Sequence, residues 1–402
     1  TSVSSPPRAT DPVEQGGSRT SGVVLLVLCS ILALHNAMRI GPVTLIEELR
    51  GRYGVDYAGV GNVVGAYTLA YGFSQLVAGL LTDRVGSRRL MLVGLGLGAV
   101  GSATFAVTEA YPVAVLARLL MGVAGGCLYT PTVAYAFAAF PDALRGRAMG
   151  FAEAGVGAGQ ILSLLGLPVL FAAAGLTPAF LSLPVAALAL GLAAALGLPD
   201  VPPSPRAARG SIRGLCGERD FWLLVVGFAF VGMLAQVAVL SWMPTYLRQV
   251  HGYGVVSAGV STGIVVTGLM LFSPLFGILS DRLTARRPVM LAGCLLAVAG
   301  FLVLLVTREP WVAVGAALLV SASMAATIPM QVVFASERFR AVGAGTAIGL
   351  VNTGGQIAAS LGGPLYGTFL DRGLGFGAVW GVALALGLLR LLALLGIREP
   401  RR

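Results

Sequence analysis

The stretch GLLTDRVGSRR at residues 79–89 returns, with substitutions, as GILSDRLTARR at residues 277–287. Two further pairs keep the same order along the chain: GVDYAGV at 54–60 matches GVVSAGV at 254–260, and GQILSLLGLP at 159–168 matches GQIAASLGGP at 355–364. Self-similarity at one offset of about 200 residues indicates an internal duplication. We therefore predict two halves, residues 22–197 and 220–397, joined by a Pro- and Arg-rich cytoplasmic linker at 198–219.

The composition places both halves in a lipid bilayer. Of 402 residues, 56% are hydrophobic and only 11% charged, and the mean hydropathy of +0.87 lies far above that of soluble proteins. A membrane-spanning helix needs about 20 mostly apolar residues. We predict an all-α polytopic membrane protein whose twelve transmembrane helices form two six-helix bundles, with spans at 22–47, 57–81, 89–108, 112–139, 147–173, 176–197, 220–248, 255–280, 288–307, 311–335, 341–370 and 376–397.

The net charge of +10 is explained by membrane orientation rather than by nucleic acid. All 27 basic residues are arginines, and most lie in loops on the side of the two termini. The opposite loops hold only Arg50, Arg52, Arg248, Arg308 and Arg372. This asymmetry predicts cytoplasmic termini, with short tails at 1–21 and 398–402, in a bacterial-type inner membrane. We expect a monomer whose partners are the lipid bilayer and a small molecule.

The motif at 79–89 resembles the signature of the major facilitator superfamily between its second and third helices, and 277–287 resembles a weaker second copy. The resemblance implies that fold and membrane transport. The stretches GAYTLAYGFSQLVAGLLTDRVG (65–86), ARLLMGVAGG (117–126) and SWMPTYL (241–247) are further similar to its organic-anion branches, the anion:cation symporters and organophosphate exchangers. Those branches hold the anion with arginines that map onto Arg39 and Arg118. Their acidic residue in the fourth helix is replaced here by Gly125 and Gly126.

Arg39 and Arg118 also stand out on physical grounds, because a charge at the bilayer centre costs at least about 2.5–3.5 kcal/mol. A guanidinium facing an aqueous cavity matches a carboxylate or phosphate bidentately. The alternatives are an outward-reaching Arg39 and a structural ion pair for Arg118. The repeat places Val239 opposite Arg39 and an apolar run near Ala317 opposite Arg118, so both charges belong to one half.

Other polar residues share these spans. Each is either a substrate contact or an ordinary packing residue. His35 and Asn36 lie one turn before Arg39, Tyr67 and Tyr71 form a stripe with Gln75, and Gln160 and Gln356 are related by the repeat. The predicted substrate contacts are His35, Asn36, Arg39, Tyr67, Tyr71, Arg118, Gln160, Trp242, Asn352 and Gln356.

Glu153 is a carboxylate placed well inside a predicted span, and its repeat partner lies near Gly349. It is a candidate for proton coupling; a permanent ion pair with Arg145 or Arg147 is the alternative. The paired motifs are instead expected to latch the halves in one conformation at the cytoplasmic face. That gating set comprises Gly79, Asp83, Arg84, Gly86, Arg88, Arg89, Asp281 and Arg282.

The sequence argues against other functions. A phosphate-binding loop needs a lysine and the chain has none, and its four cysteines and two histidines form no metal-ligand spacing. We expect no cofactor, no metal and no enzymatic activity. The leading hypothesis is a secondary active transporter of a small organic anion, working by alternating access, with proton coupling through Glu153. The alternative is a multidrug or lipid exporter of the same superfamily with hydrophobic or cationic cargo.

Overall fold

The computed structural model describes residues 17–201, 212–283, 285–339 and 344–398. The described chain is built from helices, which are α1 (Gly17–Ile40), η2 (Gly41–Leu45), α2 (Ile46–Tyr53), α3 (Tyr57–Val85), α4 (Ser87–Val107), α5 (Tyr111–Ala139), α6 (Asp142–Ala174), α7 (Leu176–Gly197), α8 (Ile212–Cys216), α9 (Arg219–Trp222), η3 (Leu223–Phe230), α10 (Val231–His251), α11 (Val255–Leu283), α12 (Arg287–Val306), α13 (Pro310–Arg338), α14 (Ala344–Asp371) and α15 (Gly375–Leu395).

Eleven helical segments within the described residues are long and apolar enough to cross a membrane. The helix that the sequence predicts as the eleventh span, α14, has the length but is not among them. It carries the polar residues Asn352, Thr353, Gln356 and Ser360 on one part of its length. With α14 added to those eleven, the predicted twelve spans are accounted for.

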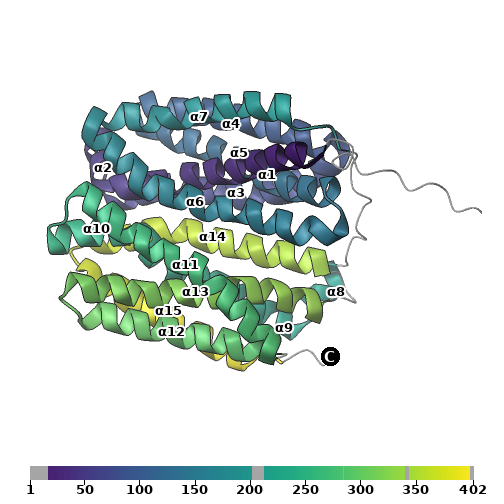
Figure 1. The fold of residues 1–402 in the computed structure, drawn as a ribbon. Coiled ribbons are helices and arrows are strands. Elements are labelled where there is room, and N and C mark those ends of the chain that lie inside the picture. Colours follow the sequence, from purple (N-terminus) through teal and green to yellow (C-terminus); the bar gives the residue numbers. More distant parts are fainter. Residues whose placement is uncertain (1–16, 202–211, 284, 340–343, 399–402) are drawn as a thin grey trace, which may run out of the picture.

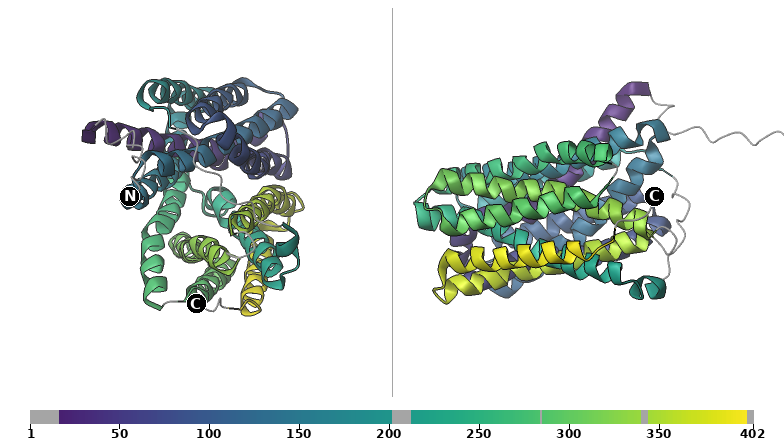
Figure 2. Two further views of the ribbon diagram at one scale, coloured as in Figure 1. Left: turned by 90° about the vertical axis from the view of Figure 1, so that its right-hand side faces the viewer. Right: turned by 90° about the horizontal axis from the view of Figure 1, so that it is seen from below.

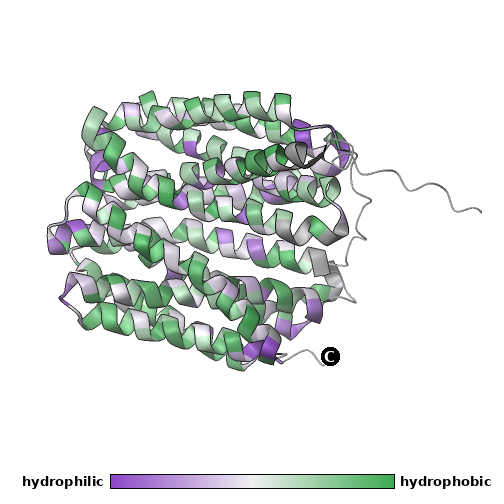
Figure 3. Cartoon of the chain, viewed as in Figure 1, coloured by the Kyte–Doolittle hydropathy of each residue, from purple (hydrophilic) through white to green (hydrophobic). Residues whose placement is uncertain are grey.

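The helices form two groups that pack side by side. In Figure 1, α1 to α7 lie in the upper group and α10 to α15 in the lower, and the end-on view of Figure 2 separates the two groups again. The groups meet where α3 packs on α14 and α6 packs on α11. We call the end with α8, α9 and the C-terminus the termini end, and the end with α2 and the α10–α11 connection the distal end. Hydrophilic residues gather toward both ends, and apolar residues cover most of the length between (Figure 3).

Glycines permit the close approach of α3 and α14. A Cβ on Gly61 would lie 2.4 Å from the carbonyl carbon of Gly363, and one on Gly65 would lie 2.3 Å from the carbonyl oxygen of Ser360. A Cβ on Gly72 would lie 2.7 Å from Cβ of Gln356. Small residues at a helix crossing let the two backbones touch. Three glycines of α3 therefore allow the two halves to pack closely against each other.

The first span departs from its predicted course. Residues 17–21, predicted as part of the tail, begin α1, and the helix stops at Ile40 instead of continuing to residue 47. Pro42 cannot donate a hydrogen bond to the carbonyl of Met38, so the chain passes into the 3-10 turn η2 before α2 resumes. In the predicted linker, residues 212–216 form α8, and α9 begins at the last linker residue, Arg219. Most of the tails and residues 202–211 fall outside the described residues.

Candidate functional site

Arg39 lies on the last turn of α1, beside the surface where the two halves meet. Its Nη2 donates a hydrogen bond of 3.4 Å to Oε1 of Gln356 on α14, and its Cζ lies 5.9 Å from the centre of the Tyr71 ring. The side chain is half-buried, and none of the ion pairs found among the described residues involves it. One long hydrogen bond to a neutral amide leaves most of the guanidinium's donors available.

Arg118 is fully buried and fastens the broken end of α1. Its side chain donates to the carbonyl oxygens of Met38, of Arg39 at 3.0 Å, and of Val63 on α3 at 3.1 Å. The carbonyl of Met38 lacks its helical donor because residue 42 is proline. A cation at a helix C-terminus also complements the helix dipole. Arg118 therefore supplies the donors that α1 lost, and it holds the backbone of Arg39 itself.

An aromatic cluster lies next to Arg39. Tyr67 Oη is 2.7 Å from Nδ1 of His35 and 3.0 Å from its carbonyl oxygen, and the His35 ring centre is 4.7 Å from that of Tyr71. Tyr129 on α5 completes the group, with its ring 6.4 Å from Tyr71. Tyr67 also lies under Arg118, whose Cζ is 4.7 Å from the ring. The structure thus brings His35, Tyr67 and Tyr71 together around the two arginines.

Glu153 joins this cluster through Tyr129. Tyr129 Oη donates a 2.9 Å hydrogen bond to Oε1 of Glu153, and the Glu153 side chain is exposed. The alternative role of Glu153 is an ion pair with Arg145 or Arg147, and the side chains of both arginines fall outside the described residues. A carboxylate with one hydroxyl donor keeps acceptor sites for a proton.

Three other predicted contacts are placed near the interface. Asn36 donates to the Leu32 carbonyl at 3.1 Å and accepts from Gln160 Nε2 at 3.4 Å, which links α1 to α6. Asn352 Nδ2 donates to Gln75 Oε1 at 2.6 Å, which links α14 to α3.

Trp242 lies toward the distal end, with its ring 6.0 Å from that of Tyr57. It is buried, and its Nε1 has no partner among the described residues.

Charged contacts tie the halves together at the distal end. Arg248 of α10 forms a two-armed ion pair with Glu48 of α2, at 2.9 and 2.8 Å, and both side chains are mostly buried. Gln249 donates to Glu47 at 2.7 Å. The carboxylate of Asp371, the last residue of α14, accepts hydrogen bonds from the amides of Tyr57 and Ala58 at 2.9 and 2.8 Å. We call these contacts the distal latch; they join the two halves at that end of the molecule.

The paired motif residues lie at the termini end. Asp83, Arg84 and Arg89 are exposed, and Gly79 and Gly86 are partly exposed. Arg88 pairs with Asp200 at 3.2 Å and donates to the Ala195 carbonyl at 2.6 Å, so it connects α4 to the end of α7 within one half.

The second copy of the motif is described only in part. Arg282 is exposed, and the side chain of Asp281 falls outside the described residues. The ion pair between Arg248 and Glu48, which joins the two halves, lies at the distal end, away from both motifs.

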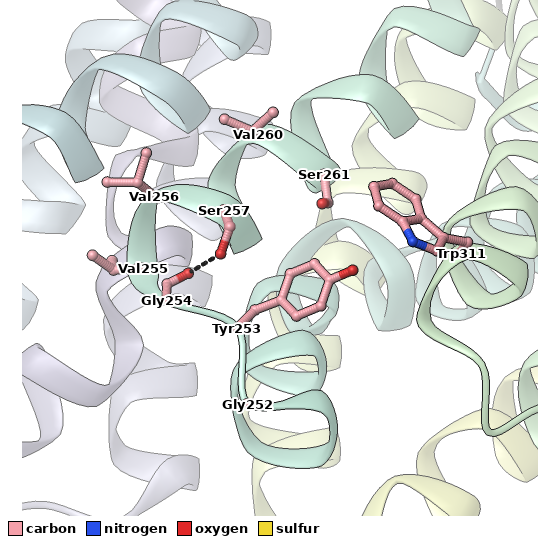
Figure 4. A pocket seen from close by; sticks show the side chains of 9 residues that line it. All are labelled: Gly252, Tyr253, Gly254, Val255, Val256, Ser257, Val260, Ser261 and Trp311. Atoms are coloured by element: carbon pink, nitrogen blue, oxygen red, sulfur yellow. Dashed lines mark hydrogen bonds between the residues drawn. The ribbon is translucent and has the colours of Figure 1, made fainter.

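A surface hollow at the distal end is separate from these residues. Figure 4 shows it between the α10–α11 connection and Trp311, with Tyr253 and Val260 among its lining and Ser257 bonded to the Gly254 carbonyl. The lining contains no charged residue and none of the predicted contacts.

Reasoning from the sequence missed Tyr129 and the distal latch. Tyr129 falls at a helix position eleven residues after Arg118, which is three turns and so the same face, but no motif marked it. Glu48, Arg248 and Asp371 lie near predicted loops, where charges are common and carry little signal.

Comparisons with known proteins agree with this architecture. The profile of the Major Facilitator Superfamily matches residues 24–363 and 263–402. The chain is 25% identical over 388 residues to a probable sulfoacetate transporter, SauU, of Cupriavidus necator, covering 88% of each chain. It is 28% identical over 242 residues to the alpha-ketoglutarate permease of Escherichia coli, covering 55% of each. A crystal structure of a bacterial homologue of the human lysosomal transporter Spinster, inward-facing and unoccupied, superposes with a TM-score of 0.76 at 15% identity, covering 95% of this chain and 98% of that one.

Proposed function

The chain belongs to the Major Facilitator Superfamily, and we propose that this membrane transporter moves a small organic anion by alternating access. The observation that carries the proposal is Arg39, a half-buried guanidinium between the two halves with one long hydrogen bond to a neutral amide. A cation kept in a membrane span without a carboxylate partner in the described chain needs an anion from outside. Relatives that transport sulfoacetate and α-ketoglutarate support a carboxylate or sulfonate.

In this proposal Arg39 binds the anionic group and Arg118 positions it. Arg118 already donates to three main-chain carbonyls, and its burial leaves no path for a ligand in this conformation. Arg118 holds the last turn of α1 in place, so the Arg39 guanidinium stays oriented toward α14. In the absence of substrate, the amide oxygen of Gln356 accepts a hydrogen bond from Arg39. The anion replaces this amide oxygen as the acceptor when it binds.

Alternating access requires that one end opens while the other closes. The distal latch closes one end here, and we propose that the termini end, facing the cytoplasm, is the open one. Anion binding between Arg39 and α14 would draw the two halves together around the site. Closure at the termini end then brings the halves into contact there, and the distal latch separates.

Glu153 is the proposed proton-exchange group. Its hydrogen bond from Tyr129, whose ring lies edge-to-face with Tyr71 beside Arg39, connects it to the anion site through two side chains. Protonation of Glu153 removes a negative charge from the neighbourhood of the anion. Proton and anion then favour each other's binding, which is the condition for symport.

The test is uptake into proteoliposomes that hold the purified protein, with labelled α-ketoglutarate and sulfoacetate as anions and a cationic dye as comparator. Saturable uptake of an anion, driven by an inward proton gradient, supports the proposal. Transport of the cation with neither anion competing would replace it with the exporter alternative.

A further inference from the structure

The second half contains a buried cation that the proposed transport site does not use. Arg390 on α15 is 3% exposed, and its Cζ lies 4.2 Å from the centre of the Phe228 ring. Among the described residues it makes no ion pair and no hydrogen bond, and its Nε is buried without a partner. A contact with an aromatic face contributes about 0.5–2 kcal/mol, whereas burying an ion costs several kcal/mol. The charge therefore requires another partner.

The chain makes room for this guanidinium at Gly232. A Cβ on Gly232 would lie 2.7 Å from Nε and 2.8 Å from Cζ of Arg390, so any larger residue would displace the group. Gln236 follows one helical turn later and therefore lies on the same face of α10. It is 1% exposed, and neither its Oε1 nor its Nε2 has a hydrogen-bond partner among the described residues. A buried amide with both ends unpaired is costly unless something else binds it.

A third buried donor without a partner lies on α13, in the same group of helices. The helices α10, α13, α12 and α15 pack in a closed ring, each against the next. Ser323 of α13 is fully buried, and its Oγ has no partner in the described chain. A Cβ on Gly293 of α12 would lie 3.2 Å from the carbonyl oxygen of Ser323, so the two helices touch there. Cys294, also fully buried, follows on α12, and a thiol is a neutral group that adds no counter-charge.

We propose that this ring of four helices holds a small monovalent inorganic anion, such as chloride, on Arg390. The guanidinium supplies the charge, and the Gln236 amide and the Ser323 hydroxyl supply further N–H and O–H donors. No carboxylate of the described chain competes for the site. Phe228 and Gly232 both lie directly against the guanidinium. The anion neutralises a charge that the bundle otherwise leaves uncompensated, and it is distinct from the transported anion at Arg39.

Equilibrium binding of radioactive chloride to the purified protein in detergent tests the proposal, after exchange into chloride-free sulfate buffer. Wild-type protein should bind chloride saturably, and Arg390→Gln should lose saturable binding. Gln236→Leu should bind about tenfold more weakly, since one neutral hydrogen bond is lost. Arg308→Gln, at an exposed arginine of the same half, is the matched control and should bind chloride as wild type does. Absence of saturable binding to wild type, or its retention in Arg390→Gln, would overturn the proposal, whatever the outcome for organic-anion transport.

A second measurement tests the proposal on wild-type protein, in case the Arg390→Gln variant does not fold. A ligand of the folded state raises thermal stability as its concentration rises. The melting temperature of wild-type protein should rise as the chloride concentration is raised over roughly two decades at constant ionic strength. Gly232→Ala keeps Arg390 but displaces it, and its melting temperature should not respond to chloride. A wild-type melting temperature that is independent of chloride contradicts the proposal without any variant.

Discussion

The distal latch predicts that one arginine sets the balance between conformations. Arg248→Ala removes both arms of the ion pair with Glu48, at 2.9 and 2.8 Å, and leaves that carboxylate mostly buried without its partner. Two charge-assisted hydrogen bonds in a partly buried setting are worth about 2 kcal/mol. This corresponds to a roughly 30-fold change in the ratio of open to closed distal ends. A state populated at about 1% would rise to about a quarter of the molecules.

The assay is a pulsed electron spin resonance distance measurement. One nitroxide is placed in the α2–α3 connection at residue 54 and the other in the α10–α11 connection at residue 253, in a protein freed of its native cysteines. Wild type should give one short distance, and Arg248→Ala should add a longer one. Arg52→Ala is the matched control, because Arg52 donates to Thr177 at 3.0 Å within a single half. An unchanged distance distribution in Arg248→Ala, or an equal change in Arg52→Ala, refutes the reasoning.

Three further predictions follow from contacts in the transport site. Glu153→Gln should keep exchange of labelled anion across the liposome membrane but lose uphill uptake driven by a pH gradient; retained uphill uptake removes Glu153 from coupling. Arg118→Met should lower the melting temperature by several degrees and reduce uptake more than tenfold. The reason is that buried carbonyls of α1 lose their donors, at a cost of about 1–3 kcal/mol each. Uptake by this variant at the wild-type rate would show that Arg39 needs no support from Arg118. Gly65→Ala should disturb the α3–α14 contact, because its Cβ would lie 2.3 Å from the Ser360 carbonyl oxygen, whereas Gly96→Ala, with open space around it, should behave as wild type in uptake and in melting temperature; equal behaviour of the two variants contradicts the packing argument.

Hydropathy and the internal repeat were enough to predict the fold, because a bilayer forces each span to satisfy its own backbone. They were least accurate at the end of α1, where the helix stops at Ile40 instead of continuing to residue 47. The first helix breaks at Pro42, which is visible in the sequence, but the residue that compensates for the break is Arg118, 76 positions later. No local pattern connects a proline in one helix to a donor in another.

The same limit applies to the candidate site. The sequence predicts substrate contacts at Arg39, Tyr71 and Gln356, which belong to different spans, and the structure brings these side chains together. Arg118 was expected to share the anion, yet its donors point at the backbone of α1. A charge within a span indicates that a residue is important, but only the folded structure shows which groups that charge contacts.

The most direct test of the central claim is the affinity of purified Arg39→Ala for the transported anion, measured by calorimetry beside wild type and Arg39→Lys. A bidentate guanidinium contact is worth about 3 kcal/mol, so Arg39→Ala should bind roughly 100-fold more weakly. Arg39→Lys should fall between the two, because it keeps the charge and loses the planar fork. An affinity of Arg39→Ala within about twofold of wild type, which is under 0.5 kcal/mol, would contradict the assignment of Arg39 as the anion-binding residue.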